Sequence, residues 1–180
     1  MIIILTVLTI VIFMIAFGTY VFLQNKKAFL KEVRSYEKTN EKVIEDYSSF
    51  VQELGSIGNI VYMPDNSRFE LRKNEAVIRL SKLESDIKAN IEELEQVVTP
   101  TKELEEVRDL LIKALIAFQE YDIKELRGFV ETLDPNLASK MMSGYLSQTP
   151  FKRAVSVSKE SSGYIDKAME IWYNEKNRLL

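Results

Sequence analysis

The chain lacks cysteine and histidine altogether, although it is 180 residues long. Without cysteine there can be no disulfide, no thiol nucleophile and no lipid-modified cysteine anchor, and the redox compartment cannot be inferred. Without histidine the most common general base is missing, and with both absent the usual zinc ligands are missing too. Carboxylate di-metal sites in helical bundles also need inward-facing Glu-x-x-His pairs. We therefore expect no metal, no cofactor and no catalysis.

Glycine, proline and excess positive charge are also scarce. Six glycines and four prolines fall at a handful of places, which is typical of long helices and not of sheets with many turns. The net charge of −3 argues against nucleic acid as a partner, because phosphate binding needs a basic face. A charged fraction of 28% beside an apolar fraction of 46% indicates a folded chain.

A long uncharged apolar run is the most prominent feature that is present. It extends from Ile2 to Leu23 and consists mostly of isoleucine, leucine, valine and phenylalanine. As an α-helix it is roughly 33 Å long, enough to cross a hydrocarbon core of about 30 Å. We predict a single-pass transmembrane anchor over residues 1–25, in which Ile2–Leu23 contacts the lipid bilayer.

A cleaved signal peptide is the alternative interpretation of this run. Signal peptides have a positive N-terminal region, an apolar core of about 7 to 15 residues and a cleavage site between small residues. No lysine or arginine precedes the run, and its only cleavage candidate, Ala16-Phe17-Gly18, lies inside it. The uncleaved anchor is therefore favoured.

Residues 26–180 have the pattern of an all-α domain, an antiparallel four-helix bundle with a short extra helix before the last long one. The long helices are expected over Gln24–Leu54, from the N-cap Ser67 to Val98, from Thr99-Pro100 to just before Gly128, and from Thr149-Pro150 to Arg178. Asp134-Pro135 is expected to start the short helix, which runs to about Ser143. The third long helix is apolar on more than one side, which predicts that it is the buried one.

The first long helix carries a seam with alternating steps of four and three residues, the spacing of packed helices. Its members are Phe29, Val33, Tyr36, Asn40, Val43, Tyr47, Phe50 and Leu54. Asn40 is the polar member. Such a residue either fixes register or oligomeric state or occupies a solvated gap. The seam also allows a parallel homodimer, in which the first helices of two chains pair where they emerge from the membrane.

Two irregular segments, Gly55–Asn66 and Gly128–Pro150, are expected to meet at the membrane-distal tip of the bundle. Loops on a rigid scaffold often carry binding residues, and methionine and tyrosine suit adaptable contact surfaces. The candidate partner-binding residues are Tyr62, Met63, Met141, Met142 and Tyr145. The alternative is that these side chains only cap the core.

Membrane orientation follows from the basic residues. Lys26, Lys27, Lys31 and Arg34 follow the apolar run, and nothing basic precedes it. The positive-inside rule therefore predicts a cytoplasmic C-terminal domain. Acidic residues interspersed on the same helix keep the extracytoplasmic alternative open.

These patterns favour a membrane-tethered, non-catalytic module that works by contact with a protein partner, as a scaffold, regulatory subunit or assembly factor. The alternative is a sensor domain that binds a small ligand in the bundle core, at Tyr36, Tyr47, Phe118, Tyr121 and Trp172. Ser158-Lys159 and Ser161 offer residue types found in some hydrolases, but neighbouring helix positions do not face one another.

Overall fold

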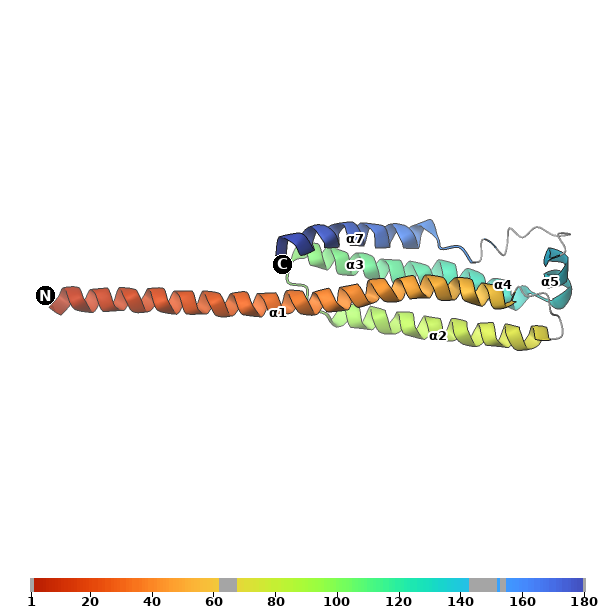
Figure 1. Cartoon of the computed structure of the whole chain (residues 1–180), viewed down its shortest axis with the longest axis horizontal. Coiled ribbons are helices and arrows are strands. Elements are labelled where there is room, and N and C mark those ends of the chain that lie inside the picture. The colour runs from red at the N-terminus through yellow and green to blue at the C-terminus, as the bar shows by residue number, and fades with distance from the viewer. Residues whose placement is uncertain (1, 62–67, 143–151, 153–154, 180) are drawn as a thin grey trace.

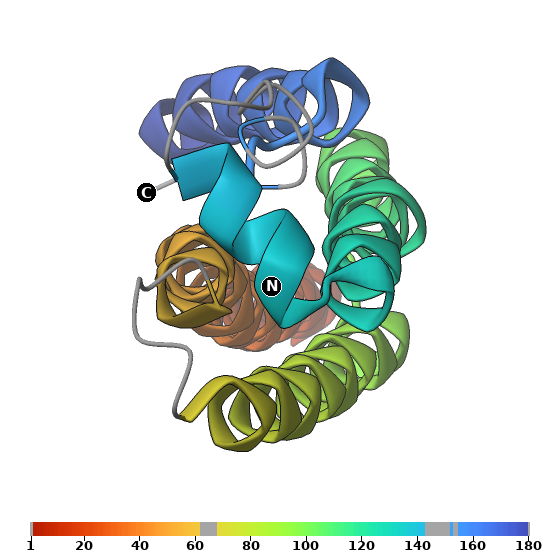
Figure 2. The ribbon, with the colours of Figure 1, turned by 90° about the vertical axis from the view of Figure 1, so that its right-hand side faces the viewer.

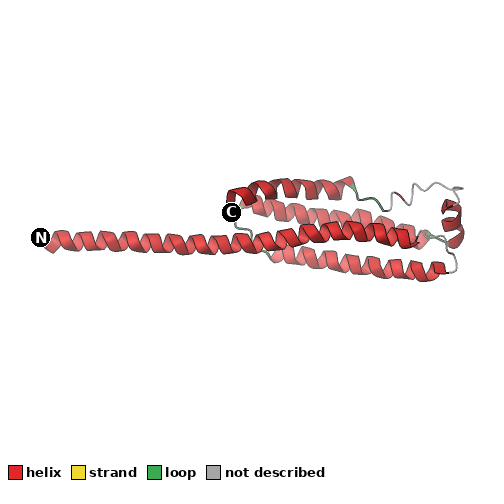
Figure 3. Ribbon diagram, in the orientation of Figure 1, coloured by secondary structure: helices red, strands yellow, loops and turns green. Residues whose placement is uncertain are grey.

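The computed structural model describes the backbone of residues 2–61, 68–142, 152 and 155–179. It describes the side chains of these residues except 2–12, 61, 138–139 and 141–142. The described residues form helices and short connections, with no strand among them, which confirms the all-α prediction (Figure 3). The helices are α1 (Ile2–Val61), α2 (Phe69–Gln96), α3 (Lys102–Ala117), the π-helical turn η2 (Phe118–Ile123), α4 (Lys124–Thr132), α5 (Pro135–Met142) and α7 (Lys159–Leu179).

The helices pack as an antiparallel bundle. The second half of α1 lies beside α2, and α3, η2 and α4 return as one continuous rod that α7 covers (Figure 1). Seen from the end, α1, α2, α3 and α7 surround a common interior, and α5 crosses that end (Figure 2). The first half of α1 extends alone from the opposite end, where the C-terminus also lies (Figure 1).

The core confirms the seam that the sequence predicts on α1. Its members from Val33 to Leu54 are all buried, and Ile57 continues it one turn further. The seam is covered by the other helices of the same chain. The parallel homodimer stays a prediction.

The contact between α3 and α7 is formed in part by small residues. Small residues in the last helix allow either a close helix approach or a kink. In the structure Ser161 and Ala168 of α7 and Ala114 of α3 are fully buried, and the Ser161 hydroxyl reaches the Ala114 carbonyl at 3.2 Å. The small side chains therefore serve close approach of the two helices.

The predicted transmembrane helix finds no support in the described residues. Among them, no helix combines the length and the apolar character needed to cross a membrane. The side chains of Ile2–Ile12, the first half of the predicted span, lie outside the described set.

Two glycines that were expected to end helices do not do so. The helix α1 continues through Gly55 to Val61, and α4 continues through Gly128 to Thr132. A glycine inside a helix costs about 1 kcal/mol relative to alanine. Burial of a residue such as Ile57 or Val130, both 0% exposed, contributes about 1.5–3 kcal/mol and outweighs that cost.

Three helix starts differ from the sequence prediction or fall outside the description. Thr101, and not Thr99, caps α3, and its hydroxyl accepts a hydrogen bond from the Leu104 N–H at 3.2 Å. The last helix starts at Lys159 and not at Pro150, since residues 155–158 are described as non-helical. The proposed cap Ser67 lies outside the described residues.

The start of α5 confirms one prediction. Pro135 is its first residue, and the Asp134 carboxylate accepts a hydrogen bond from the Leu137 N–H at 2.8 Å. This is the expected pairing of an acidic N-cap with proline at the first helical position.

Candidate functional site

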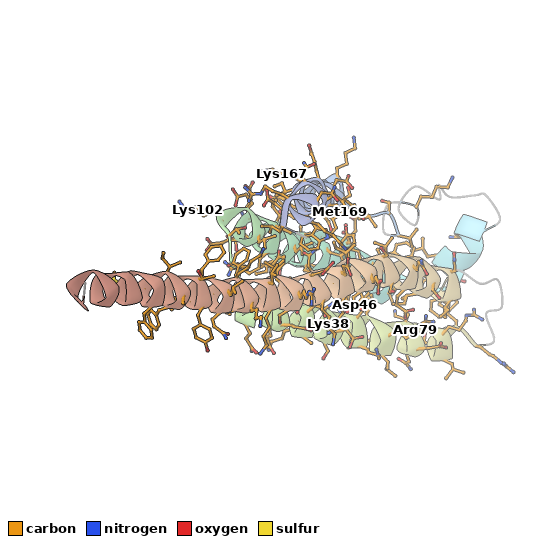
Figure 4. The ribbon with its side chains drawn as sticks, turned by 60° about the vertical axis from the view of Figure 1, so that its left-hand side comes forward. Lys38, Asp46, Arg79, Lys102, Lys167 and Met169 are labelled. Carbon is orange, nitrogen blue, oxygen red and sulfur yellow. The ribbon has the colours of Figure 1, made fainter. Side chains whose placement is uncertain are left out.

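The part of α1 that precedes the bundle exposes a continuous apolar surface. No other element lies beside it in Figure 1, and Figure 4 shows side chains standing out from it. Seven large apolar side chains of this part are between 50% and 71% exposed: Phe13, Met14, Ile15, Phe17, Tyr20, Phe22 and Leu23. Exposed apolar surface of this extent marks a binding surface or a membrane contact.

None of the side chains predicted to form the membrane-distal tip is described. Tyr62, Met63 and Tyr145 lie outside the described residues. Met141 and Met142 are the last residues of α5, whose backbone crosses the end of the bundle (Figure 2). The contact surface at this tip stays a prediction.

The aromatic residues considered for a ligand pocket have two different positions. Four are buried in the core: Tyr36 packs on Trp172 with ring centroids 5.8 Å apart, and Tyr47 packs edge-on against Phe118 at 5.5 Å. Tyr121 is 51% exposed on the outer face of η2. The five rings therefore do not gather at one place.

The π-helical turn η2 is the main local feature that the sequence interpretation missed. Its signal is the spacing of buried apolar residues, in which a step of five residues separates Phe118 from Ile123. An extra residue in the turn rotates the following helix, so that Tyr121, which the ligand-binding alternative places in the bundle core, faces solvent. Turns of this kind are frequently found at functional positions.

A hydrogen-bonded chain joins three helices at the level of this turn. The Ser161 hydroxyl of α7 donates to the Ala114 carbonyl of α3 at 3.2 Å. The Tyr47 hydroxyl of α1 lies 2.6 Å from the Ser161 oxygen and must be the donor, because the serine proton is already committed. Burial raises the pKa of the Tyr47 hydroxyl further above its ordinary value of 10.0.

Asp122 of η2 holds the start of α7. Its carboxylate accepts hydrogen bonds from the Ser158 N–H at 2.8 Å and from the Ser158 hydroxyl at 3.4 Å. Asp122 as a whole residue is only 3% exposed, and burial raises the pKa of its carboxyl group to about 6 although the hydrogen bonds from Ser158 act in the opposite direction. Asp122 therefore changes charge near neutral pH.

A surface cavity of about 720 Å³ adjoins this carboxylate. Its lining combines acidic groups, hydroxyls and one lysine: Tyr121, Asp122, Glu125, Ser156, Val157, Ser158, Lys159 and Glu160. The hydroxyls of Ser158 and Ser161 both have partners in the fold. The arrangement is that of a helix junction, with Asp122 as its titratable member.

Replacing Asp122 by asparagine is expected to remove a pH dependence of stability. With a folded pKa of about 6 against an ordinary 3.8, the folded state holds this proton more tightly than the unfolded chain. The stabilisation is complete below about pH 4 and is lost as pH rises through 6, by about 2–3 kcal/mol. The Asp122→Asn variant keeps an oxygen that can accept the hydrogen bond from the Ser158 N–H. The stability of this variant relative to the native chain should therefore rise as pH increases from about 4 to about 6.

Urea denaturation at pH 4, 5, 6 and 7, followed by circular dichroism, measures this difference. Glu160→Gln is the matched control, because Glu160 is exposed on the rim of the same cavity. A constant stability difference between Asp122→Asn and the native chain across these pH values would contradict the assignment.

Asn40 and Tyr36 are buried polar residues without partners among the described atoms. They lie one turn apart on α1, and both are 0% exposed. Neither the amide atoms of Asn40 nor the Tyr36 hydroxyl has a hydrogen-bond partner within the described part of the chain. A buried polar group in this state costs about 1–3 kcal/mol of stability.

Asn40→Leu is accordingly expected to stabilise the bundle by about 1–2 kcal/mol, because leucine has a similar volume and leaves no unsatisfied amide. Asn90 provides the matched control: it is 4% exposed, and its side-chain amide donates to Asp46 at 3.0 Å. Asn90→Leu should therefore destabilise the bundle. Thermal melts of both variants measure the two shifts, and a lower melting temperature for Asn40→Leu would show that its amide is hydrogen-bonded in solution.

Metal coordination has no candidate among the described side chains, where no three or more histidine, cysteine, aspartate or glutamate residues are grouped so that they could hold an ion. Comparison with known proteins adds no assignment: no protein-family model, no curated protein and no solved structure matches the chain.

Proposed function

We propose that the chain is a membrane-tethered, non-catalytic helical module that acts through protein contact, as a scaffold, regulatory subunit or assembly factor. The proposal rests on the isolated apolar part of α1. Its large side chains from Phe13 to Leu23 are exposed, whereas the bundle buries the seam from Val33 to Leu54. A bundle with a complete core has no use for this surface in its own folding.

A lipid bilayer is the partner that fits this surface. Large apolar side chains occur at nearly consecutive positions, so they point to all sides of the helix, and a helix that is apolar all round belongs in a protein core or in lipid. Its backbone hydrogen bonds are satisfied internally, as the hydrocarbon interior requires. The sequence of Ile2–Ile12 continues the uncharged run to a total length that can span the bilayer.

Two features of the bundle support action by protein contact. Its serine hydroxyls at the α3–α7 junction are engaged in holding helices together, and its core aromatics pack on one another. The end crossed by α5 lies farthest from the proposed membrane (Figure 1). We place the contact with a partner protein there, at the predicted residues Tyr62, Met63, Met141, Met142 and Tyr145.

The proposed orientation has the bundle in the cytoplasm. Lys26, Lys27, Lys31 and Arg34 follow the apolar part of α1 directly, and the positive-inside rule puts such residues on the cytoplasmic side.

Fractionation of cells that contain the full chain tests the proposal. The chain should stay with the membranes after alkaline extraction, and protease added to intact cells should leave the bundle uncut. Recovery of the intact chain as a dissolved species would overturn the membrane assignment. Digestion of the bundle from outside would reverse the orientation and leave the anchor in place.

A further inference from the structure

Four basic residues form a group on α1 between its apolar part and the bundle. We define Lys26, Lys27, Lys31 and Arg34 as the basic collar. All four are exposed. Within the described residues, the acids of α1 that form ion pairs do so with cations of α2 and α7 and not with the collar. Lys27, Lys31 and Arg34 are spaced by four and three residues, so they share one side of the helix.

Two cations that pack against α1 farther along the bundle, Arg79 and Lys176, are paired with acids of α1. Arg79 makes two hydrogen bonds to Glu53, at 2.7 and 2.8 Å. The Lys176 ammonium of α7 forms ion pairs with both Glu37 and Glu41 of α1, at 2.7 and 2.6 Å. These two glutamates are the acids that follow the collar one to two turns further along α1, and they are already engaged. Glu32, which is also exposed, lies between Lys31 and Arg34, so residues 26–34 keep a net charge of +3 for an external partner.

Lys26 and Lys27 lie at the height where lipid headgroups would lie, and the backbone of Lys31 and Arg34 lies beyond that layer. At 1.5 Å per residue, Lys26 and Lys27 are about 5–6 Å beyond Leu23, Lys31 about 12 Å and Arg34 about 16 Å. The headgroup layer of each leaflet is about 5–8 Å thick, the difference between the whole bilayer and its hydrocarbon core.

Side-chain direction brings the more distant cations closer to that layer. In an α-helix the Cα–Cβ bonds tilt toward the N-terminus, which for α1 is the membrane side. Long lysine and arginine side chains also extend toward the interface when their helix leaves a membrane. Lys31 additionally lines an open cavity of about 460 Å³ between α1 and the end of α2, so its ammonium group is accessible.

We propose that the basic collar binds the headgroups of anionic lipids and so enriches these lipids around the emerging helix. The inference rests on the proposed membrane anchoring. Basic residues beside a membrane each contribute attraction to anionic lipids, and this attraction is screened by salt.

Energy transfer from Trp172 tests the collar, because it is the only tryptophan of the chain. Trp172 packs on Tyr36, whose position on α1 is about 20 Å beyond Leu23. The full chain is reconstituted into phosphatidylcholine vesicles that contain phosphatidylserine, with a small share of either dansyl-phosphatidylserine or dansyl-phosphatidylcholine. At low salt we expect energy transfer from Trp172 to dansyl-phosphatidylserine to exceed transfer to dansyl-phosphatidylcholine about two-fold or more. The ratio of the two transfer efficiencies should fall at high salt.

The collar variant replaces Lys26, Lys27, Lys31 and Arg34 by glutamine, and its ratio should fall to about one. The matched control removes the same number of charges from exposed lysines elsewhere: Lys88, Lys113, Lys124 and Lys159. The control should keep the native ratio.

The outcomes separate the two proposals. A chain that does not sediment with either kind of vesicle overturns the anchoring, and the collar assignment with it. A chain that sediments but shows equal transfer to both lipids overturns the collar alone. An equal loss of preference in the control variant also overturns it, because the effect would then belong to the total charge.

Discussion

Arginine at Phe13 and Phe17 is expected to release most of the chain from membranes. Each arginine near the centre of a spanning helix costs about 2.5–3.5 kcal/mol, so the pair costs about 5–7 kcal/mol. The apolar residues of Ile2–Leu23 favour insertion by about 5–9 kcal/mol on the same scale. Two substitutions therefore cancel most of the driving force.

The fraction of the chain that stays in the membrane pellet after alkaline extraction measures this release. Ser85→Arg with Ala89→Arg is the matched control, since both residues are exposed on α2 and the added charge is the same. The control should remain in the pellet as the native chain does. A double variant retained as well as the control would show that the apolar part of α1 is not embedded in lipid.

Trp172→Ala is expected to destabilise the bundle by about 3–5 kcal/mol, the usual cost of removing a large buried aromatic side chain. Trp172 is 1% exposed and packs on Tyr36 of α1. The Lys176 ammonium lies 5.7 Å from the centre of its ring and also holds Glu37 of α1. Removing the indole thus weakens the attachment of α7 to α1 as well as the core.

Urea denaturation of the full chain in mild detergent, followed by circular dichroism, measures this loss. Trp172→Phe is the control, because it keeps a ring against Tyr36 and should lose less stability than the alanine variant. Membrane retention should not change in either variant, since Trp172 lies in the bundle. A decrease in the free energy of unfolding below about 1 kcal/mol for Trp172→Ala would be typical of a surface substitution and would contradict the central position of Trp172 in the core.

The helical architecture could be predicted from the sequence because periodic burial controls it. The seam on α1 from Val33 to Leu54 could be predicted because residues spaced by three and four share a helix face. Asp134-Pro135 correctly identified the start of α5. Glycine was a poor guide to helix ends. A Cβ atom added at Gly55 or Gly128 would meet no described atom within 4 Å, so neither glycine is required by close packing. Both continue their helices because the apolar residues around them are buried.

The candidate site was predictable only in part. The apolar run and the basic collar are visible in the sequence because each is a continuous local feature. The π-helical turn is not, since it depends on how the rod from α3 to α4 packs against α7, and only the five-residue step from Phe118 to Ile123 hints at it. The raised pKa of Asp122 likewise arises from burial, which local sequence does not reveal.

The continuity of α1 has a mechanical consequence. Its 60 residues form one helix of about 90 Å with no break between the apolar part and the bundle. Held in a membrane, it would act as a lever whose bundle end reaches about 57 Å above Leu23. A tilt of about 20°, ordinary for a spanning helix, would sweep that end sideways by about 20 Å. Because a spanning helix can adjust its tilt to local bilayer thickness, that thickness would affect how far to the side of its membrane anchor the bundle can contact a partner.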